Sequence, residues 1–497
     1  MTDAPAPARA GAGTHAHAHA ELHRVGPHSR LAVLGADKVR RIHETSLDIL
    51  RSVGVMYHSQ RALDALEEHG AVVDRETTVA KVPPEAVEKA LQTLPRSFVL
   101  GGRSPEWDLP LDGDHAYLTV DGCAVRVRDA DGTVRPSNKA DVAAAARVTE
   151  GLDNLSATAA IVSAQDRPEQ TRVLHEFDAC VRNSHKHTIV VSIKEDREAR
   201  SLIRMAEAVA GGSAELAARP LFTCILCTVS PLHQERFGMD LAFALAEAGI
   251  PFMLYPMPIL GATAPVTPAG TAVVNNTEIL SAIVAVQLAC PGAKIIHAGG
   301  PTALDMRSGS YFAAVPESIL LRAVQAQMAD FYGLPAGLGY GGTKAKEPEP
   351  QSAWENASTM AMEFFSGADF IFGAGLLDGS QIHALEQLAI DDEVFGMVTR
   401  LLRGVRVDDE QLALDLIAKM GFKGDYLFDG HTREHVRELW RARLGETGTY
   451  EAWQAAGRPT TVQRARQRVD ELLAREPAGF ADDLAREFEQ IIAAAER

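Results

Sequence analysis

Three short apolar runs, each ending in a glycine-rich corner, constrain the fold of this chain most strongly. They are Ile295–Gly300, Gly337–Gly342 and Phe370–Gly375. Short apolar runs bounded by glycine predict buried strands, and the segments between these runs are long enough for crossover helices. A strand, a polar loop and a helix thus repeat at a period of about forty residues, which is typical of an α/β fold.

The same pattern, followed along the chain, predicts a (β/α)₈ TIM barrel. Seven strands are expected, at Leu155–Val162, Thr188–Ile193, Leu221–Thr228, Phe252–Tyr255, Lys294–Ala298, Ala336–Tyr340 and Asp369–Phe372. We place the eighth within Gln381–Leu388, where a helix explains the pattern nearly as well. The span of roughly 240 residues suits such a barrel. A doubly wound open sheet is the alternative, but no G-x-G-x-x-G motif opens a helix after a strand.

The regions outside the barrel differ in composition. Residues 1–30 form a His-rich tail, with histidines at 15, 17 and 19, and we expect it to be disordered. Residues 31–150 read as an amino-terminal region of helices and a small β meander, followed by the barrel at 151–403. Residues 404–497 are charged and helical in pattern, and we expect them to pack on the barrel's flank or on another subunit.

Charge and composition exclude several classes of partner. The net charge of −17 repels phosphate backbones, so nucleic acid is not an expected partner. We find no apolar run of the roughly 18 residues that a membrane span requires, and the amino terminus lacks the apolar core of a secretory signal. The five cysteines are too few and too scattered for a disulfide framework, so we expect a cytoplasmic protein.

Two motifs that suggest metal or redox chemistry are accounted for by the geometry of strands. Cys224 and Cys227 form C-x-x-C inside a predicted strand, where residues three apart face opposite sides of the sheet. They cannot share one tetrahedral metal there, and we interpret them as buried structural thiols. His185 and His187 flank Lys186 at the start of another strand, the end of a barrel that usually serves stability.

Candidate functional residues follow the predicted strands, at the carboxyl-terminal end of the barrel, which we call the mouth. His297, Arg307, Tyr340 and Lys344 all occupy such positions, and we expect them to line one cavity. Aromatic rings can hold a quaternary ammonium group, which donates no hydrogen bond but is attracted to the ring quadrupole. The aromatic candidates at the mouth are Tyr255, Tyr311, Tyr340, Phe372 and Trp354. Asp305 could pair with Arg307 or contact a charged substrate.

The sequence contains no order of Ser, His and Asp, no phosphate-binding loop and no H-E-x-x-H motif. It therefore identifies no catalytic residue and no metal site. Composition and spacing alone indicate a large α/β-barrel enzyme with a polar and partly aromatic mouth.

Several long stretches resemble the trimethylamine:corrinoid methyltransferase family. They begin at Lys38 (KVRRIHETSLDILRSVGV), Leu94 (LPRSFVLGGRSPEWD), Val134 (VRPSNKADVAAAARVTEGLDNL), Gly299 (GGPTALDMRSGSYFAAVPE), Tyr332 (YGLPAGLGYGGTKAKEPEPQSAWENA) and His431 (HTREHVRE). These matches occur in the family's order and cover roughly residues 30–445. A long co-linear resemblance is far more specific than any single motif.

The resemblance implies a (β/α)₈ barrel that moves a methyl group from a methylated amine to a cobalt(I) corrinoid on a separate protein. One branch of the family, acting on trimethylamine, carries pyrrolysine, whereas this chain contains only the twenty standard residues. It therefore resembles the branch that includes demethylases of quaternary amines such as glycine betaine. We expect no tightly bound cofactor, a corrinoid protein as partner and a homo-oligomer.

The chemistry of that branch agrees with the missing acid–base residues. A quaternary ammonium leaves as a neutral tertiary amine, so the protein has mainly to position the methyl group and exclude water. Arg307, Lys344 or His297 could hold a substrate carboxylate, and His383 and Glu386 are further candidates. Two alternatives remain: direct methyl transfer to tetrahydrofolate, and a barrel that binds a quaternary amine without turnover.

Overall fold

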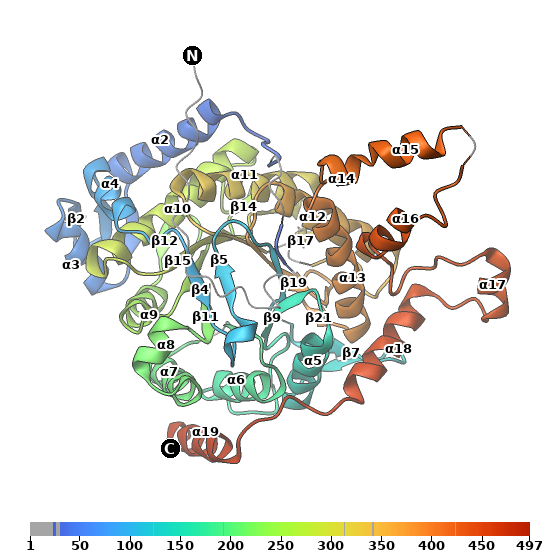
Figure 1. Ribbon diagram of the computed structural model, residues 1–497. Helices are drawn as coiled ribbons and strands as arrows, with labels where there is room; N and C mark the ends of the chain where they lie inside the picture. Colours follow the sequence, from blue (N-terminus) through green and yellow to red (C-terminus); the bar gives the residue numbers. More distant parts are fainter. Residues whose placement is uncertain are drawn as a thin grey trace.

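The computed structural model describes residues 23–25, 30–122, 124–191, 193–312, 314–339, 342–422 and 424–497. A central barrel is surrounded by helices, and the carboxy-terminal segments lie along the outside (Figure 1). Most of the predicted His-rich tail, including its three alternating histidines, lies outside the described residues.

Eight parallel strands close the barrel, which confirms the predicted fold class. In order around the barrel they are β10 (His187–Val190), β11 (Phe222–Cys227), β13 (Phe252–Tyr255), β15 (Ile295–Gly299), β18 (Ala336–Gly339), β19 (Phe370–Ala374), β6 (Tyr117–Val120) and β9 (Leu155–Ala159). The open-sheet alternative is excluded because β6 joins β19 to β9 and leaves no edge.

The eighth strand was predicted in the wrong place. It is β6, from the region interpreted as a meander, so the barrel begins at Tyr117 and not at residue 151. Residues 381–388 instead form a two-residue strand, β21 (Ile382–His383), and the start of a helix. The repeat was hidden because a hairpin, β7 (Arg126–Arg128) and β8 (Val134–Pro136), separates β6 from the helix that follows it.

Helices pack around the barrel wall. They are α5 (Lys139–Gly151), α6 (Arg172–Asn183), α7 (Asp196–Ala210), α8 (Ser213–Ala218), α9 (Arg236–Glu247), α10 (Pro268–Ala289), α11 (Pro316–Tyr332), α12 (Pro350–Phe365) and α13 (Leu385–Leu402). Within the described part of the chain, α10 alone is long and apolar enough to span a membrane. Its residues are mostly buried, because it packs against neighbouring helices as a core element.

The amino-terminal region packs on one side of this ring (Figure 1). It comprises α2 (Ala36–Ser52), β1 (Val55–Tyr57), α3 (Gln60–Glu68), β2 (Val72–Asp74), β3 (Val79–Lys81) and α4 (Pro84–Gln92). Helix α2 buries Val39, Ile42 and Leu50 along one face, and Gly54 beyond it has a positive φ of 88°. β1 also pairs with β12 (His233–Gln234), so this region is joined to the barrel through a shared sheet.

A second hairpin closes the amino-terminal end of the barrel, the floor. It consists of β4 (Phe98–Leu100) and β5 (Leu109–Leu111), joined through a short helix, η1 (Pro105–Trp107). The Tyr117 hydroxyl donates to the Pro110 carbonyl, and His187 Nδ1 lies 3.0 Å from the Gly101 carbonyl oxygen. Because Tyr117 and His187 are the first residues of their strands, these contacts fix the hairpin beneath the lumen.

Beyond α13 the chain continues as short helices and two longer ones. They are α14 (Asp409–Leu412), α15 (Leu414–Met420), α16 (Gly430–His435), η2 (Val436–Glu438), α17 (Tyr450–Ala455), α18 (Thr461–Leu473) and α19 (Asp482–Ala495). Helix α18 packs against α13 and α5, and α19 packs against α7. Residues 461–495 thus run along the barrel's flank, whereas α14, α15, α16 and α17 project away from it (Figure 1).

Lys186 stabilises the floor, as expected for a residue at this end of the barrel. Its buried amino group donates to the carbonyl oxygens of Thr149, Leu152 and Leu155, at 2.6, 2.8 and 2.6 Å. Burial lowers the pKa of Lys186 to about 8. The side chain therefore ties the end of α5 to the start of β9 and serves packing, not catalysis.

We predict that Lys186→Met lowers the free energy of unfolding by roughly 3 kcal/mol, because three buried carbonyl groups lose a charged donor. Lys194→Met is the matched control: its ion pair with Glu169 is largely exposed, so it should change stability by less than about 1 kcal/mol. Denaturation monitored by circular dichroism measures both effects, and equal stability of the two variants would contradict the role given to Lys186.

Candidate active site

Two small sheets form the mouth of the barrel, because each is built from segments that follow barrel strands. One contains β14 (Ile259–Leu260), β16 (Thr302–Asp305) and β17 (Ser310–Phe312). The other contains β20 (Leu376–Leu377), β21, β7 and β8. The mouth is therefore framed by hydrogen-bonded backbone, which holds its side chains in defined positions.

An aromatic pair lies at the carboxyl ends of four neighbouring strands. Tyr255 ends β13 and its ring centroid lies 5.1 Å from that of Phe372 on β19. A side chain on Gly300 or Gly339 would place its Cβ 2.2 Å from the Tyr255 hydroxyl oxygen. The glycine corners that follow β15 and end β18 are thus required to make room for this ring. Tyr255 and Phe372, two of the aromatic candidates, thus lie against each other.

Tyr311 and Lys344 lie beside each other at the rim. A Cβ built on Gly379 would lie 3.3 Å from Lys344 Nζ and 3.5 Å from Tyr311 Cδ1. Tyr311 also raises the pKa of Tyr255, after the larger effect of burial, so the two phenols are close enough to interact electrostatically. Tyr311 therefore connects the deep aromatic pair to the charged rim.

Three cations surround one carboxylate at the rim. Lys346 Nζ lies 2.6 Å from Asp378 Oδ1, and Lys344 Nζ and Arg126 Nη2 each lie 3.7 Å from an oxygen of the same side chain. Lys344 is partly exposed, and its backbone NH donates to the buried Glu355 carboxylate. Asp378 has a positive φ of 52°, so the turn that carries it is tightly constrained. The local charge of this cluster is positive.

Two residues at the mouth were missed by sequence reasoning. Asp121 follows β6 directly, and it raises the pKa of both Cys227 and Tyr255. Asp121 was overlooked because β6 was not recognised as a barrel strand. Cys227 ends β11 next to Tyr255, and it is exposed, so the prediction of a buried thiol is wrong for it.

The C-x-x-C motif nevertheless behaves as its strand spacing predicts. Cys224 is buried between the barrel and its helices, whereas Cys227 faces the mouth, so the two thiols do not form one site. Although part of the side chain is exposed, the protein atoms around the sulfur limit its solvation, and this effect, together with the negative charge of Asp121, raises the pKa of Cys227 to about 11. The thiol is therefore protonated at neutral pH. Among the residues that the structure describes, no three His, Cys, Asp or Glu side chains are grouped to hold a metal ion.

A buried ion pair stands behind the aromatic pair. Arg322 Nε of α11 lies 2.6 Å from Glu363 Oε1 of α12, and neither side chain is exposed to solvent. Burial raises the pKa of Glu363 to about 7, although Arg322 opposes this shift. Arg322 also acts electrostatically on Tyr255, whose pKa is raised well above its usual value, chiefly by burial. Tyr255 is therefore a neutral phenol.

The prediction that His297 lines the mouth is wrong. His297 lies in the middle of β15, and its neighbours Ile296 and Ala298 face the lumen beside Gly337. The alternation of a strand therefore turns His297 outward, where its ring lies 5.9 Å from that of Tyr332 on α11. It is fully buried, and burial lowers its pKa to about 3.

Of the other predicted site residues, His383 and Glu386 line a separate cavity and Arg307 lies in an exposed turn. His383 is buried, its Nδ1 lies 2.9 Å from the Gly375 carbonyl oxygen, and burial lowers its pKa to about 4. Together with Glu386 it lines a cavity of about 400 Å³ between the β7–β8 hairpin, α5 and α13, and the lining includes neither Tyr255 nor Phe372. Arg307 is exposed in the turn between β16 and β17, where its backbone NH donates to Asp305. Tyr340 lies outside the described residues.

Several known methyltransferases are similar to this chain. Residues 6–496 match the family model described as trimethylamine methyltransferase. The chain is 33% identical over 444 residues to a trimethylamine methyltransferase of Desulfitobacterium hafniense, covering 89% of each chain. It is 28% identical over 445 residues to a glycine betaine methyltransferase of the same species, covering 89% of this chain and 92% of the relative. The crystal structure of the monomethylamine methyltransferase of Methanosarcina barkeri aligns over 91% of this chain and 92% of that chain, with 12% identity and a TM-score of 0.49.

We predict that Gly339→Ala disrupts the aromatic pair, because its methyl group would collide with Tyr255 and with Phe372 Cε2, 2.8 Å away. Overpacking of this kind costs about 1–3 kcal/mol. Adding Tyr255→Phe removes the nearest atom and should restore part of the lost stability, which a double-mutant cycle of thermal denaturation measures. Strict additivity of the two substitutions would show that Gly339 and Tyr255 do not compete for the same space.

Proposed function

The chain belongs to the trimethylamine methyltransferase family, and we propose that it transfers a methyl group from a betaine-like quaternary amine to the cobalt(I) corrinoid of a partner protein. The observation that carries this proposal is the order of side chains at the mouth. The aromatic rings of Tyr255 and Phe372 lie on one side of Tyr311, together with the Asp121 carboxylate. The cationic rim around Asp378 lies on the other side of Tyr311. This order matches a substrate that is cationic at one end and anionic at the other.

The quaternary ammonium end would lie against the aromatic pair. A permanent cation gains about 0.5–2 kcal/mol from each ring that it contacts, and its methyl groups fit an apolar surface. Asp121 adds a negative charge close to the aromatic pair, since it raises the pKa of both Tyr255 and Cys227. A neutral amine would gain much less from these groups. The site therefore favours a substrate with a fixed positive charge.

The carboxylate end would lie against Lys344. Its amino group is held 3.7 Å from Asp378, a distance that leaves it able to bind a second anionic partner, and Lys346 already neutralises the same carboxylate. A charge-assisted hydrogen bond to a substrate carboxylate contributes about 1.5–3 kcal/mol when it is shielded from water. Arg307, on the neighbouring hairpin, stays a further candidate for this contact.

The proposed reaction requires little acid–base chemistry from the protein. The bond between nitrogen and the methyl carbon breaks, the neutral tertiary amine leaves with the electron pair, and the corrinoid supplies the nucleophile that receives the methyl group. Tyr255 is a neutral phenol and Cys227 is a protonated thiol, so neither competes as an anionic methyl acceptor. The residues of this chain would orient the substrate and exclude water, which lowers the barrier by restricting the reactants to the productive geometry.

We predict that glycine betaine, proline betaine or carnitine methylates a cobalt(I) corrinoid protein in the presence of this chain, whereas trimethylamine does so much more slowly. A tertiary amine is a poor electrophile, and the chain contains only the twenty standard residues. Spectroscopic detection of cobalt methylation, with the four amines assayed side by side, measures the preference. Turnover of trimethylamine alone would refute the proposal.

Two controls separate the acceptor and the carboxylate contact. Tetrahydrofolate replaces the corrinoid protein in a parallel assay, and methylfolate formation there would establish the alternative acceptor. Lys344→Met should raise KM for glycine betaine about tenfold, which corresponds to about 1.4 kcal/mol. The KM for choline should stay unchanged, because choline has no carboxylate. Lys89→Met, on the exposed face of α4, should change neither value.

A further inference from the structure

The segment between α13 and residue 441 has no core of its own. We call residues 405–422 and 424–440 the arm; it contains α14, α15, α16 and η2, and none of these helices has a buried residue. The arm projects from the body of the protein beside α12 and α13 (Figure 1). A segment of this length without a buried core gains stability when another surface covers its apolar side chains.

Polar contacts hold the arm together and attach it to the barrel. Lys419 pairs with Asp429 at 3.1 Å, and His435 lies 2.7 Å from Glu438. At the end of the arm, the Glu393 carboxylate of α13 accepts hydrogen bonds from the backbone NH groups of Arg443 and Leu444. The arm is thus a folded unit on a fixed base, and its apolar side chains are left for another surface.

Large apolar side chains cover the arm's surface. They include Val405, Leu414, Phe422, Leu427, Phe428 and Leu439, and Phe428 is 83% exposed. A buried aromatic side chain removes about 150–250 Å² from water, and soluble monomers rarely expose contiguous apolar patches of more than a few hundred Å². The arm therefore has the surface of an interface, although the chain as a whole is strongly acidic.

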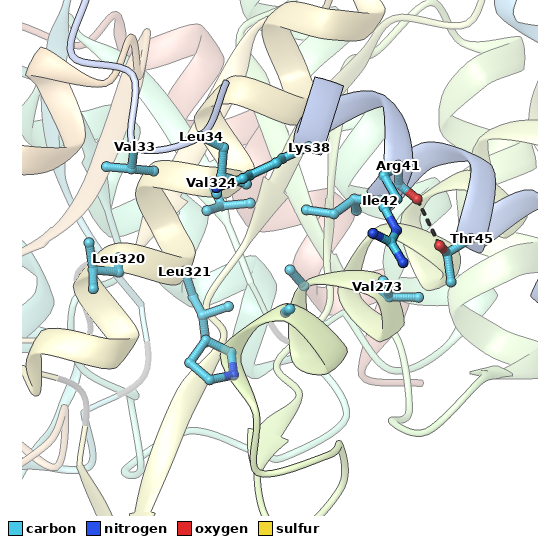
Figure 2. Close-up of a pocket in the computed structure, with 13 residues that line it drawn as sticks. Val33, Leu34, Lys38, Arg41, Ile42, Thr45, Val273, Leu320, Leu321 and Val324 are labelled. Carbon is cyan, nitrogen blue, oxygen red and sulfur yellow. Dashed lines mark hydrogen bonds between the residues drawn. The ribbon is translucent and has the colours of Figure 1, made fainter. Parts of the chain in front are cut away.

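The same chain contains an apolar groove that the arm does not fill. The groove lies between α2, α10 and α11, has a volume of about 630 Å³, and is lined by Ile42, Val273, Leu320, Leu321 and Val324 (Figure 2). Lys38 and Arg41 of α2 lie at its edge, and Leu320 is exposed in it. This is an apolar surface bordered by positive charge.

We propose that the arm of one copy packs into the groove of a second copy. The two surfaces are complementary in charge as well as in polarity. The apolar residues of α14 and α15 stand next to four acidic residues, Asp408, Asp409, Glu410 and Asp415, of which Asp408 and Glu410 are paired with the arm's Arg406. The groove, in contrast, is bordered by Lys38 and Arg41. Opposite charges beside matching apolar faces fix the register of an interface and favour its formation.

The position of the arm argues against the methyl-accepting protein as its occupant. Helix α13 begins after the strand-end segments of the mouth, so its last residue, Leu402, lies toward the floor. Arg403, which follows it, donates a hydrogen bond to the backbone carbonyl of Arg24, and Arg24 pairs with His115 just before the start of β6, at the floor. A methyl acceptor must approach the opposite end of the barrel. A contact between arm and groove joins two different surfaces, so repeating it generates a ring if the rotation closes.

Sedimentation velocity of the purified full-length chain tests the proposal. We expect the wild-type chain to associate at micromolar concentration. The arm variant Phe422→Ser/Phe428→Ser and the groove variants Leu320→Glu and Thr45→Trp should each raise the dissociation constant at least a hundredfold. Val72→Ser, an exposed apolar position on β2 outside both surfaces, is the matched control and should associate like wild type. All substituted side chains are exposed, and circular dichroism verifies that each variant is folded.

Mixing the variants distinguishes this contact from other modes of association. The arm variant retains its groove and the groove variant retains its arm, so an equimolar mixture should form a heterodimer through the one intact pair. A monomeric wild-type chain would overturn the proposal, as would association that survives the arm substitutions. Association that survives both groove substitutions would indicate contact between two arms and would also overturn it. A mixture that stays monomeric would exclude the pairing of arm with groove.

Discussion

The hydroxyl of Tyr255 occupies the space that side chains on Gly300 and Gly339 would fill, and this fit links the barrel to its site. The ring of Tyr255 reaches across the ends of β15 and β18 and packs against Phe372. Two glycine corners are therefore a requirement of packing at the point where chemistry is expected. A large ring can stand at the mouth only because neighbouring strands present no side chains there.

Charge is distributed around that ring in a way that the fold dictates. Asp121 follows β6, the strand that closes the barrel, whereas Lys344 and Asp378 follow β18 and β19. The acidic Asp121 and the basic Lys344 thus enter the mouth from different strand ends. The buried pair of Arg322 and Glu363 joins α11 to α12, and removing one partner would leave an uncompensated charge in the protein interior. The proposed recognition of a dipolar substrate depends on this arrangement of charges.

The sequence predicted the barrel because short apolar runs bounded by glycine are typical of buried strands. It misplaced the closing strand because β6 is only four residues long and precedes a hairpin, so no helix marks it. Missing β6 also concealed Asp121. His297 was misassigned because a strand's alternation, and not its distance from a glycine, decides which side a residue faces. The proximity of Lys344 to Tyr311 depends on long-range packing that no local pattern encodes.

The most direct test of the central claim compares glycine betaine with 3,3-dimethylbutanoate, which has the same shape and carboxylate but a carbon in place of the charged nitrogen. Isothermal titration calorimetry measures both affinities at one pH and ionic strength. Because aromatic faces and Asp121 would recognise the fixed positive charge, glycine betaine should bind at least tenfold more tightly, a difference of about 1.4 kcal/mol. Equal affinity, or tighter binding of the carbon isostere, would contradict the account.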